Sequence, residues 1–326
     1  MVTGRELDDA VAVLRAGGLV AFPTETVYGL GADAANPGAV RRIFEAKGRP
    51  PTHPVIVHLA DAVQAANWAR EVPEPARRLA QRFWPGPLTL ILHRARGVSD
   101  VVTGGQDTVA LRVPSHPVAQ RLLARFGGGV AAPSANRHGR VSATTAEHVR
   151  REFGNAVTCV LDGGEADVGI ESTIVDLSGA RPALLRPGWI QAAEIEDVLG
   201  SPLVVPGADA PRAPGTLAAH YAPRTPLTLA EGDLALELAA SLVRQGRRVA
   251  VLALSSQRPL LENLEWVAAP RAAAGYAHAL YASLRRLDEA GCDAIIVERP
   301  PQSPEWAAIH DRLTRAAAGT PAPDDA

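Results

Sequence analysis

The sequence predicts an α/β protein with two domains of unequal size. Short apolar strands alternate with amphipathic helices along most of the 326 residues, an order typical of α/β folds. Residues 201–226 are rich in proline and interrupt the alternation, which then starts again. Apolar residues make up 47% of the chain and charged residues 21%, which indicates a globular protein with a large core and argues against extensive disorder.

The first part of the chain predicts an open α/β sheet. Amphipathic patterns predict helices at residues 7–16, 39–46, 62–70, 74–83, 117–125 and 146–153. Apolar runs predict strands at residues 19–22, 55–59, 88–93, 109–113, 130–132, 157–161, 172–176 and 183–186. Residues 23–31 follow the first strand as a polar loop. Because these strands end in loops rich in glycine, proline and hydroxyl residues, we expect ligands to bind there.

A smaller α/β domain is predicted after the proline-rich stretch. Its strands are expected at residues 227–230, 248–254 and 294–297, and its helices at 234–244, 275–290 and 305–316. The predicted organisation is therefore a larger α/β domain at residues 1–195, a linker or lid at 196–226 and a small C-terminal domain at 227–320.

Several classes of protein are disfavoured by composition. Charged residues in the first 18 positions argue against a signal peptide, and no apolar stretch approaches the ~20 residues of a membrane helix. Cys159 and Cys292 lack metal-binding spacing, so a cytoplasmic chain with two thiols is expected. Residues 1–190 hold 21 basic and 18 acidic residues, and a formal charge of only +3 gives little support to nucleic-acid binding.

Lys47 is the single lysine among 33 basic residues. A lysine retained where arginine otherwise supplies the cations indicates a need for a compact ammonium group. Lys47 and Arg49 flank Gly48, and in an extended segment they would face the same way and grip one polyphosphate. The alternatives are chance and ordinary basic residues at a helix C-terminus.

Polar residues mark two further strand ends. Thr24 and Thr26 flank Glu25 after the first strand, where they either bind a polar small molecule or cap a turn. Thr108 and Arg112 lie four residues apart and so on one face of a strand. A buried arginine needs an anion, which is either a ligand or a carboxylate of the protein.

The remaining candidate loops contain small and hydroxyl residues. Ser134 lies in a loop that follows an apolar strand. In such a loop, backbone amides and the serine hydroxyl could bind a phosphate. Ser172 lies in a second cluster of this kind, and Arg186 ends the last strand of the first part. Tyr221 and its neighbour His220 occur in the proline-rich stretch, which favours a lid.

Motifs for covalent or ordinary nucleotide chemistry are missing from the sequence. It contains no GxxxxGK[ST], no GxGxxG after a strand, no HExxH and no nucleophile triad. Cations, hydroxyls and glycines instead favour positioning and electrostatic stabilisation of a polyphosphate.

Taken together, these motifs resemble the YrdC-like threonylcarbamoyl-AMP synthases in their long, two-domain form. The resemblance runs from about residue 5 to beyond residue 300. The matching segments are FPTETVYGLG (22–31), AKGRP (46–50), PVIVHL (54–59), WPGPLTLIL (84–92), DTVALRVP (107–114), APSAN (132–136), DGG with GIESTIVD (162–176), LLRPG (184–188) and APGTLAAHYAP (213–223). It implies a twisted open sheet in the N-terminal domain and a smaller, Rossmann-like C-terminal domain.

The resemblance also implies an activity. L-threonine, bicarbonate or CO2, and ATP would give threonylcarbamoyl-AMP and pyrophosphate, with Mg²⁺ carried by ATP. The product would pass to a tRNA-modifying transferase complex that forms threonylcarbamoyladenosine. Direct contact with tRNA or double-stranded RNA is left open, and no membrane partner is implied.

Site residues follow from the resemblance by position. Lys47 and Arg49 are implied as catalytic residues. The implied threonine-binding residues are Thr26, His58, Arg112, Ala132 and Ser172. The implied ATP-binding residues are Arg49, His53, Thr108, Ser134, Ser142, Arg186 and Tyr221. No side chain is implied as a metal ligand. His53 departs from the family, which usually has asparagine or a similar small polar residue there.

Two alternatives remain at this point. YrdC-like folds also resemble double-stranded RNA binders, so the chain could be a non-catalytic RNA-binding module. Related domains also take part in carbamoyl transfer during enzyme maturation, but this chain lacks the added zinc-finger and acylphosphatase-like segments of those proteins.

Overall fold

The computed structural model describes residues 2–207 and 209–319 of the chain. Contacts along the chain separate two compact units. The first unit comprises Met1–His138 and Ala143–Thr216, and the second comprises Gly139–Ser142 and Leu217–Ala326. The predicted linker is therefore divided at residue 216, and a short segment from the middle of the chain belongs to the second unit.

The first unit contains a mixed nine-stranded sheet. Its strands are β1 (Val20–Phe22), β2 (Gly29–Asp33), β3 (Ile56–His58), β4 (Leu88–His93), β5 (Thr108–Arg112), β6 (Val130–Ala131), β7 (Cys159–Val160), β8 (Thr173–Asp176) and β9 (Ala183–Arg186). They are arranged in the order β7-β1-β2-β6-β3-β5-β4-β8-β9. The pairs β1–β7, β3–β5 and β4–β8 are parallel, and the other neighbours are antiparallel.

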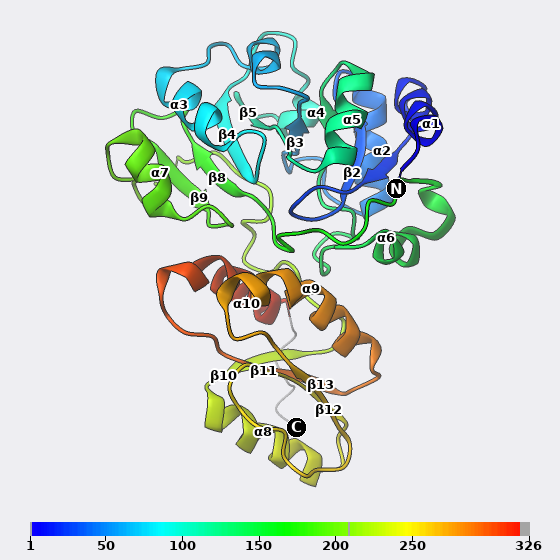
Figure 1. The fold of residues 1–326 in the computed structure, drawn as a ribbon, viewed down its shortest axis with the longest axis vertical. Helices are drawn as coiled ribbons and strands as arrows, with labels where there is room; N and C mark the ends of the chain where they lie inside the picture. The colour runs from blue at the N-terminus through cyan, green and yellow to red at the C-terminus, as the bar shows by residue number, and fades with distance from the viewer. Residues whose placement is uncertain (1, 208, 320–326) are drawn as a thin grey trace. The chain divides into compact units, whose positions relative to one another are not determined.

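Helices surround this sheet (Figure 1). They are α1 (Gly4–Arg15), α2 (Pro37–Lys47), α3 (Glu74–Phe83), α4 (Asp100–Thr103), α5 (Pro117–Phe126), α6 (Ala146–Phe153) and α7 (Ala192–Leu199), with 3₁₀ turns η1 (Val63–Asn67) and η2 (Gly154–Ala156). The α/β architecture predicted from the sequence is confirmed.

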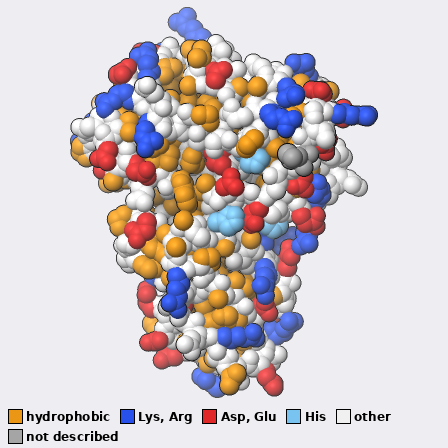
Figure 2. Space-filling model, in the orientation of Figure 1, with side chains coloured by type: hydrophobic (Ala, Val, Ile, Leu, Met, Phe, Trp, Pro, Cys, Tyr) orange, Lys and Arg blue, Asp and Glu red, His pale blue; other side chains and the backbone are white. Residues whose placement is uncertain are grey.

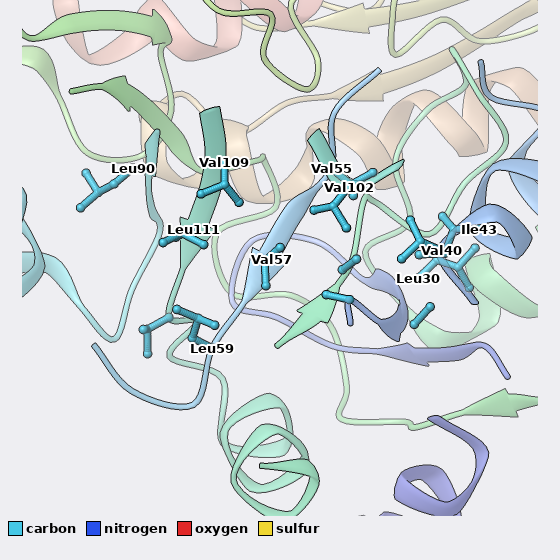
Figure 3. Packing of buried hydrophobic residues seen from close by; sticks show 14 of the residues in the cluster. Leu30, Val40, Ile43, Val55, Val57, Leu59, Leu90, Val102, Val109 and Leu111 are labelled. Carbon is cyan, nitrogen blue, oxygen red and sulfur yellow. The ribbon is translucent and has the colours of Figure 1, made fainter. Parts of the chain in front are cut away.

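The core of the first unit lies on both faces of the sheet. Ala21 of β1 belongs to the larger apolar cluster, whereas its neighbours Val20 and Phe22 belong to a second cluster with α1 and α5, because side chains alternate along a strand. Figure 3 shows the larger cluster, with Val57 and Leu111 on adjacent strands.

A smaller apolar cluster extends over the sheet to the predicted linker. Ile56, Ile91, Ala110 and Ile174 come from β3, β4, β5 and β8, and buried Ala213 packs with them. The part of the predicted linker that belongs to the first unit therefore covers part of its sheet.

Helix α2 places Lys47 at a defined point. Asn36 caps its N-terminus by accepting from the amides of Gly38 and Ala39, and Pro37 occupies its first position. Gly48 ends it with φ of 61°, a left-handed conformation that favours glycine. Lys47 is thus the last helical residue, and the extended segment expected around Lys47 and Arg49 is wrong.

The second unit is a parallel α/β domain. Its strands are β10 (Leu227–Ala230), β11 (Val249–Ala253), β12 (Leu264–Ala268) and β13 (Ala294–Glu298), in the order β10-β13-β11-β12. Its helices are α8 (Gly232–Arg244), α9 (Ala273–Glu289) and α10 (Ala307–Ala318), with a 3₁₀ turn η3 (Pro304–Trp306). Helix α8 lies on one face of the sheet, and α9 and α10 lie on the other (Figure 1), as in Rossmann-like domains.

Several elements differ from the sequence prediction. Strand β2 occupies part of the predicted loop at residues 23–31, and α4, α7 and β12 were not predicted. The helix expected at 62–70 is the shorter turn η1, and α7 crosses the predicted boundary at residue 195. In β2, a Cβ on Gly31 would lie 2.7 Å from the Phe22 ring. Close approach therefore requires glycine, which weakens the strand signal.

Candidate functional site

A buried hydroxyl–guanidinium cluster lies between the β1–β2 loop and the end of β5. Thr24 Oγ1 donates to the carbonyl of Val27 at 2.6 Å and hydrogen-bonds Thr26 Oγ1 at 2.8 Å. Arg112 donates from Nη1 to Thr26 Oγ1 at 2.9 Å and from Nε to the carbonyl of Gly86 at 3.3 Å. The structure therefore brings together two predicted threonine-binding residues, Thr26 and Arg112.

Glu25 is the counter-ion of this cluster. Its Oε1 lies 2.7 Å from Arg112 Nη2, and its Oε2 accepts from the amide of Ser115 at 3.1 Å. Both charged side chains are buried. The protein thus supplies the carboxylate that a buried arginine requires, which fixes the guanidinium in place beside Thr26.

His58 lies next to Arg112 across the β3–β5 pairing. Burial, and then the charge of Arg112, lower the pKa of His58 to about 3, so its imidazole is neutral at pH 7. Its Nδ1 has no hydrogen-bond partner among the described residues. Buried polar atoms normally have a hydrogen-bond partner. The Nδ1 atom of His58 is therefore a candidate to bind a polar ligand.

Lys47 reaches the loop that follows β6. Its ammonium donates to the carbonyl of Ser134 at 2.6 Å and also to the carbonyl of Asn136. The amide of His138 donates back to the carbonyl of Lys47 at 2.9 Å. The predicted ATP-binding residue Ser134 therefore lies directly beside the unique lysine.

The charge of Lys47 is buried with backbone carbonyls as its hydrogen-bond partners, and the carboxylates of Glu152 and Glu171 act on it without forming an ion pair. The residue is only 3% exposed, and no carboxylate within the described ranges forms an ion pair with it. Burial, followed by the charge of Arg49, holds the pKa of Lys47 well below its usual value. An anion at this point would offset the cost of burying the ammonium group.

Two histidines extend this cationic region. Arg49 donates to the carbonyl of Pro54 at 2.7 Å, and its charge is the second cause, after burial, of lowered pKa values in His53 and His138. The two rings lie 5.5 Å apart between centroids, and the pKa of His138 falls to about 4. Lys47, Arg49, His53 and His138 therefore form one group.

A second arginine cluster surrounds Ser172. Arg186 donates from Nε and Nη2 to the Ser172 carbonyl at 3.1 and 2.8 Å, and from Nη2 to its Oγ at 3.1 Å. Thr89 Oγ1 lies 2.8 Å from the same Oγ. Arg186 Nη1 also donates to the carbonyl of Pro214 at 2.8 Å, so the predicted linker is bonded to a predicted ATP-binding residue.

The remaining predicted site residues are Thr108, Ala132, Ser142 and Tyr221. Thr108 begins β5, at the opposite end from Arg112. The amide of Ala132 donates to the carbonyl of Ile56 at 2.9 Å. Ser142 and Tyr221 belong to the second unit, so the predicted ATP-binding residues are divided between the two units.

Sequence reasoning missed some members of these clusters. Glu25 was noted only as a neighbour of two threonines, and Thr89 and His138 were not singled out. No spacing rule connects Thr89 to Ser172 or His138 to His53, because each pair meets through the sheet topology. The one available signal for Glu25 was that buried Arg112 needed a carboxylate.

Two family models together match most of the chain. A family model described as "Telomere recombination" matches residues 12–188, and one described as "Threonylcarbamoyl-AMP synthase, C-terminal domain" matches residues 190–318. The threonylcarbamoyl-AMP synthase of Pyrococcus abyssi is 41% identical, with 94% of this chain and 92% of the relative covered. The Bacillus subtilis enzyme of that name is 42% identical, with 96% and 93% covered.

A solved structure gives the same result. The crystal structure of Pyrococcus abyssi Sua5 complexed with L-threonine is similar, with a TM-score of 0.90 and 40% identity. The similarity covers 96% of this chain and 94% of that one. The chain therefore belongs to the threonylcarbamoyl-AMP synthase family of nucleotidyltransferase enzymes.

Proposed function

We propose that the chain makes threonylcarbamoyl-AMP and pyrophosphate from L-threonine, bicarbonate or CO2, and ATP. The observation that carries the proposal is the ammonium of Lys47, which is buried beside carbonyls and has no carboxylate partner within the described residues. The pyrophosphate that leaves ATP is an anion that would complete this site. The same activity is named for the relatives from Pyrococcus abyssi and Bacillus subtilis.

The threonine site is proposed at the cluster around Arg112 together with Ser172 of the Arg186 cluster. Thr26 and Ser172 have buried hydroxyls, and His58 offers an unpaired nitrogen. These groups can hydrogen-bond the hydroxyl and carboxylate of threonine. A buried polar site of this kind selects against ligands that cannot pair with it.

The chemistry then needs no nucleophile from the protein. The amine of threonine adds to CO2 and loses a proton, which gives a carbamate. A carbamate oxygen attacks the α-phosphorus, a new P–O bond forms, and the bond to the β-phosphate bridging oxygen breaks as pyrophosphate leaves. Lys47 and Arg49 neutralise the charge that develops on the leaving group, and the clusters hold both reactants in line.

Mg²⁺ is proposed to enter with ATP. Within the described part of the chain, no group of three or more His, Cys, Asp or Glu residues could hold a metal ion. Phosphate oxygens and water are common Mg²⁺ ligands in nucleotide sites. The nucleotide would therefore supply the ligands, and Lys47 and Arg49 would contact the phosphate oxygens that the metal leaves open.

We further propose that the product passes to a tRNA-modifying transferase complex, so the chain would act in the cytoplasm where tRNAs are modified. Within the described residues, no helix is long and apolar enough to cross a membrane. On the face shown in Figure 2, basic and acidic side chains are interspersed. An RNA-binding module would gather its cations on one surface, and neither this face nor the formal net charge of −2 supports that alternative.

The experiment is a pyrophosphate-release assay with single-substrate omissions. Release from ATP should require both L-threonine and bicarbonate, and mass spectrometry should detect threonylcarbamoyl-AMP. Pyrophosphate release that is independent of threonine, or no release under any condition, would contradict the proposal.

A further inference from the structure

The second unit holds a short segment from the middle of the chain. Residues 139–142 belong to it by their contacts. Arg285 of α9 donates from Nε to the carbonyl of Ser142 at 3.1 Å and from Nη2 to the carbonyl of Val141. One guanidinium group therefore fixes two successive carbonyls, including that of a predicted ATP-binding residue.

The same segment pairs with the second half of the predicted linker. The amide of Ala222 donates to the carbonyl of Gly139 at 2.8 Å, and Arg140 Nη1 donates to the carbonyl of Pro223 at 3.2 Å. A β-bridge joins Arg140 and Ala222. Ser142 and Tyr221 are thus carried on two backbone segments that are bonded to each other.

Tyr221 is held in an uncommon conformation. Its φ is 61°, in the left-handed region that non-glycine residues rarely adopt and that persists only when the surroundings enforce it. The residue is 1% exposed, and its ring stacks on that of Tyr281 in α9 with centroids 5.7 Å apart. The guanidinium carbon of Arg312 in α10 lies 5.3 Å from the same ring, which adds a cation–π contact.

Residues of α9 and α10 also accept hydrogen bonds from linker amides on either side of Tyr221. The amide of His220 donates to the carbonyl of Arg315 at 3.1 Å. The amides of Arg224 and Thr225 donate to the carboxylate of Asp288 at 2.9 and 2.7 Å. In each case the partner is a side chain or carbonyl of the second unit, so this unit determines the path of the linker backbone.

Arg312 is itself fixed. Its side chain is fully buried, and Nη1 lies 2.6 Å from Asp311 Oδ2. Asp311 in turn binds Arg315 at 2.9 Å. A buried arginine held by a carboxylate and packed on a tyrosine loses little side-chain entropy when the tyrosine binds a ligand, which makes it a suitable support.

We propose that α9 and α10 form a frame that positions Ser142 and Tyr221 for ATP, with Arg285, Tyr281 and Arg312 as positioning residues. The inference rests on the proposed function, and it gives the C-terminal domain a role in nucleotide binding. Removing a support should leave the chemical step intact but lower the fraction of protein in the binding-competent conformation, which raises the apparent KM for ATP.

Two adjacent arginines of α9 provide a matched test. Arg285 holds the carbonyls of Val141 and Ser142, whereas Arg286 forms an exposed ion pair with Glu265 at 2.8 Å. We expect Arg285→Ala to raise the KM for ATP about tenfold or more, and to leave the KM for threonine and kcat within about twofold. Arg286→Ala should match the wild type in all three.

Hydrogen exchange provides a readout independent of activity. In full-length Arg285→Ala, amides at residues 139–142 and 220–223 should exchange faster than in Arg286→Ala. Tyr281→Leu, which removes the stacking ring, should give the same pattern, and it serves as the second variant if Arg285→Ala does not fold.

The outcomes separate the two proposals. An unchanged KM for ATP in an active Arg285→Ala or Tyr281→Leu protein overturns the positioning role, even if exchange is faster. Absence of threonine-dependent activity in the wild type instead contradicts the proposed function. A rise in the KM for ATP confined to Arg285→Ala and Tyr281→Leu supports the frame.

Discussion

The two units differ in whether a carboxylate of the protein pairs with the donor groups near their strand ends. In the first unit, Lys47 is buried against the carbonyls of Ser134 and Asn136 without a carboxylate partner among the described residues. In the second unit, Glu298 at the end of β13 accepts from the amides of Leu254, Ser255 and Ser256 at 2.8 to 3.1 Å. The Ser255 hydroxyl also donates to it.

This difference shows where an anion is needed. Three amides at the end of β11 form a concave set of donors of the kind that binds phosphate, but the carboxylate of Glu298 already occupies it. Within residues 2–207 and 209–319, the ammonium of Lys47 has no comparable partner. Both units are α/β folds with polar strand ends, so the site, rather than the fold, decides function.

The largest expected effect is at Lys47. Lys47→Ala should abolish product formation while the thermal midpoint of the ligand-free protein stays close to that of the wild type. Lys47→Arg should also be slower, by roughly 30- to 1000-fold, because a planar fork cannot replace a compact ammonium. Steady-state kinetics with calorimetric unfolding check this, and wild-type turnover by Lys47→Arg would falsify the argument.

Substrate choice should show the next largest effect. Valine has nearly the shape of threonine but would leave the buried hydroxyl of Thr26 or Ser172 without its ligand partner. We therefore expect valine to react at least ~100-fold more slowly than threonine and also more slowly than serine. Competing amino acids in one product assay measure the ratios. Equal rates for valine and threonine would remove the pocket assignment.

Glu298 should affect stability rather than chemistry. Glu298→Ala removes the acceptor shared by several partly buried donors and should lower the free energy of unfolding of the second unit by about 3 kcal/mol. Hydrogen exchange of β11 and β13 amides reports this unit separately. At a temperature where the variant is folded, kcat should be unchanged; a large loss of kcat would show that Glu298 belongs to the site.

The smallest effect expected is a pH dependence from His58. Its pKa is lowered to about 3 in the folded protein, first by burial and then by Arg112, whereas an unfolded histidine titrates near 6.5. The unfolded state therefore binds the proton more tightly, so stability is complete above pH 6.5 and falls as the pH drops toward 3. At pH 5 the loss from this residue is about 2 kcal/mol.

His58→Asn should remove that part of the pH dependence. Denaturant unfolding at pH 7 and pH 5 measures it, with His93→Asn as a control because His93 is only partly buried. If both variants lose stability equally between the two pH values, His58 is not the group responsible.

Much of the fold was predictable because its elements carry strong local patterns. Helix α3 and strands β4 and β9 begin and end where the sequence places them. Strand β2 was not predictable in this way. Its glycines are needed for close contact with Phe22 and Val130, and glycine has a low strand propensity. Strand β12 is only partly buried, so its apolar pattern is weak.

The candidate site was predictable by motif but not by geometry. The sequence marks Lys47 and Arg112 through their unusual context, whereas the partners Asn136 and Glu25 depend on how distant strands pair. The contacts of Ser142 with Arg285 join residues 143 positions apart, and no local pattern contains that information. The roles assigned to the individual site residues remain predictions.

The most direct test of the contrast between the two units is calorimetric titration of pyrophosphate with Mg²⁺ into the wild type, Lys47→Ala and Glu298→Ala. If the anion site lies at Lys47, the wild type and folded Glu298→Ala should bind with the same affinity. Lys47→Ala should bind at least ~30-fold more weakly, since a charge-assisted contact of about 2 kcal/mol is lost. Wild-type affinity in Lys47→Ala, or loss of binding in Glu298→Ala alone, would contradict the account.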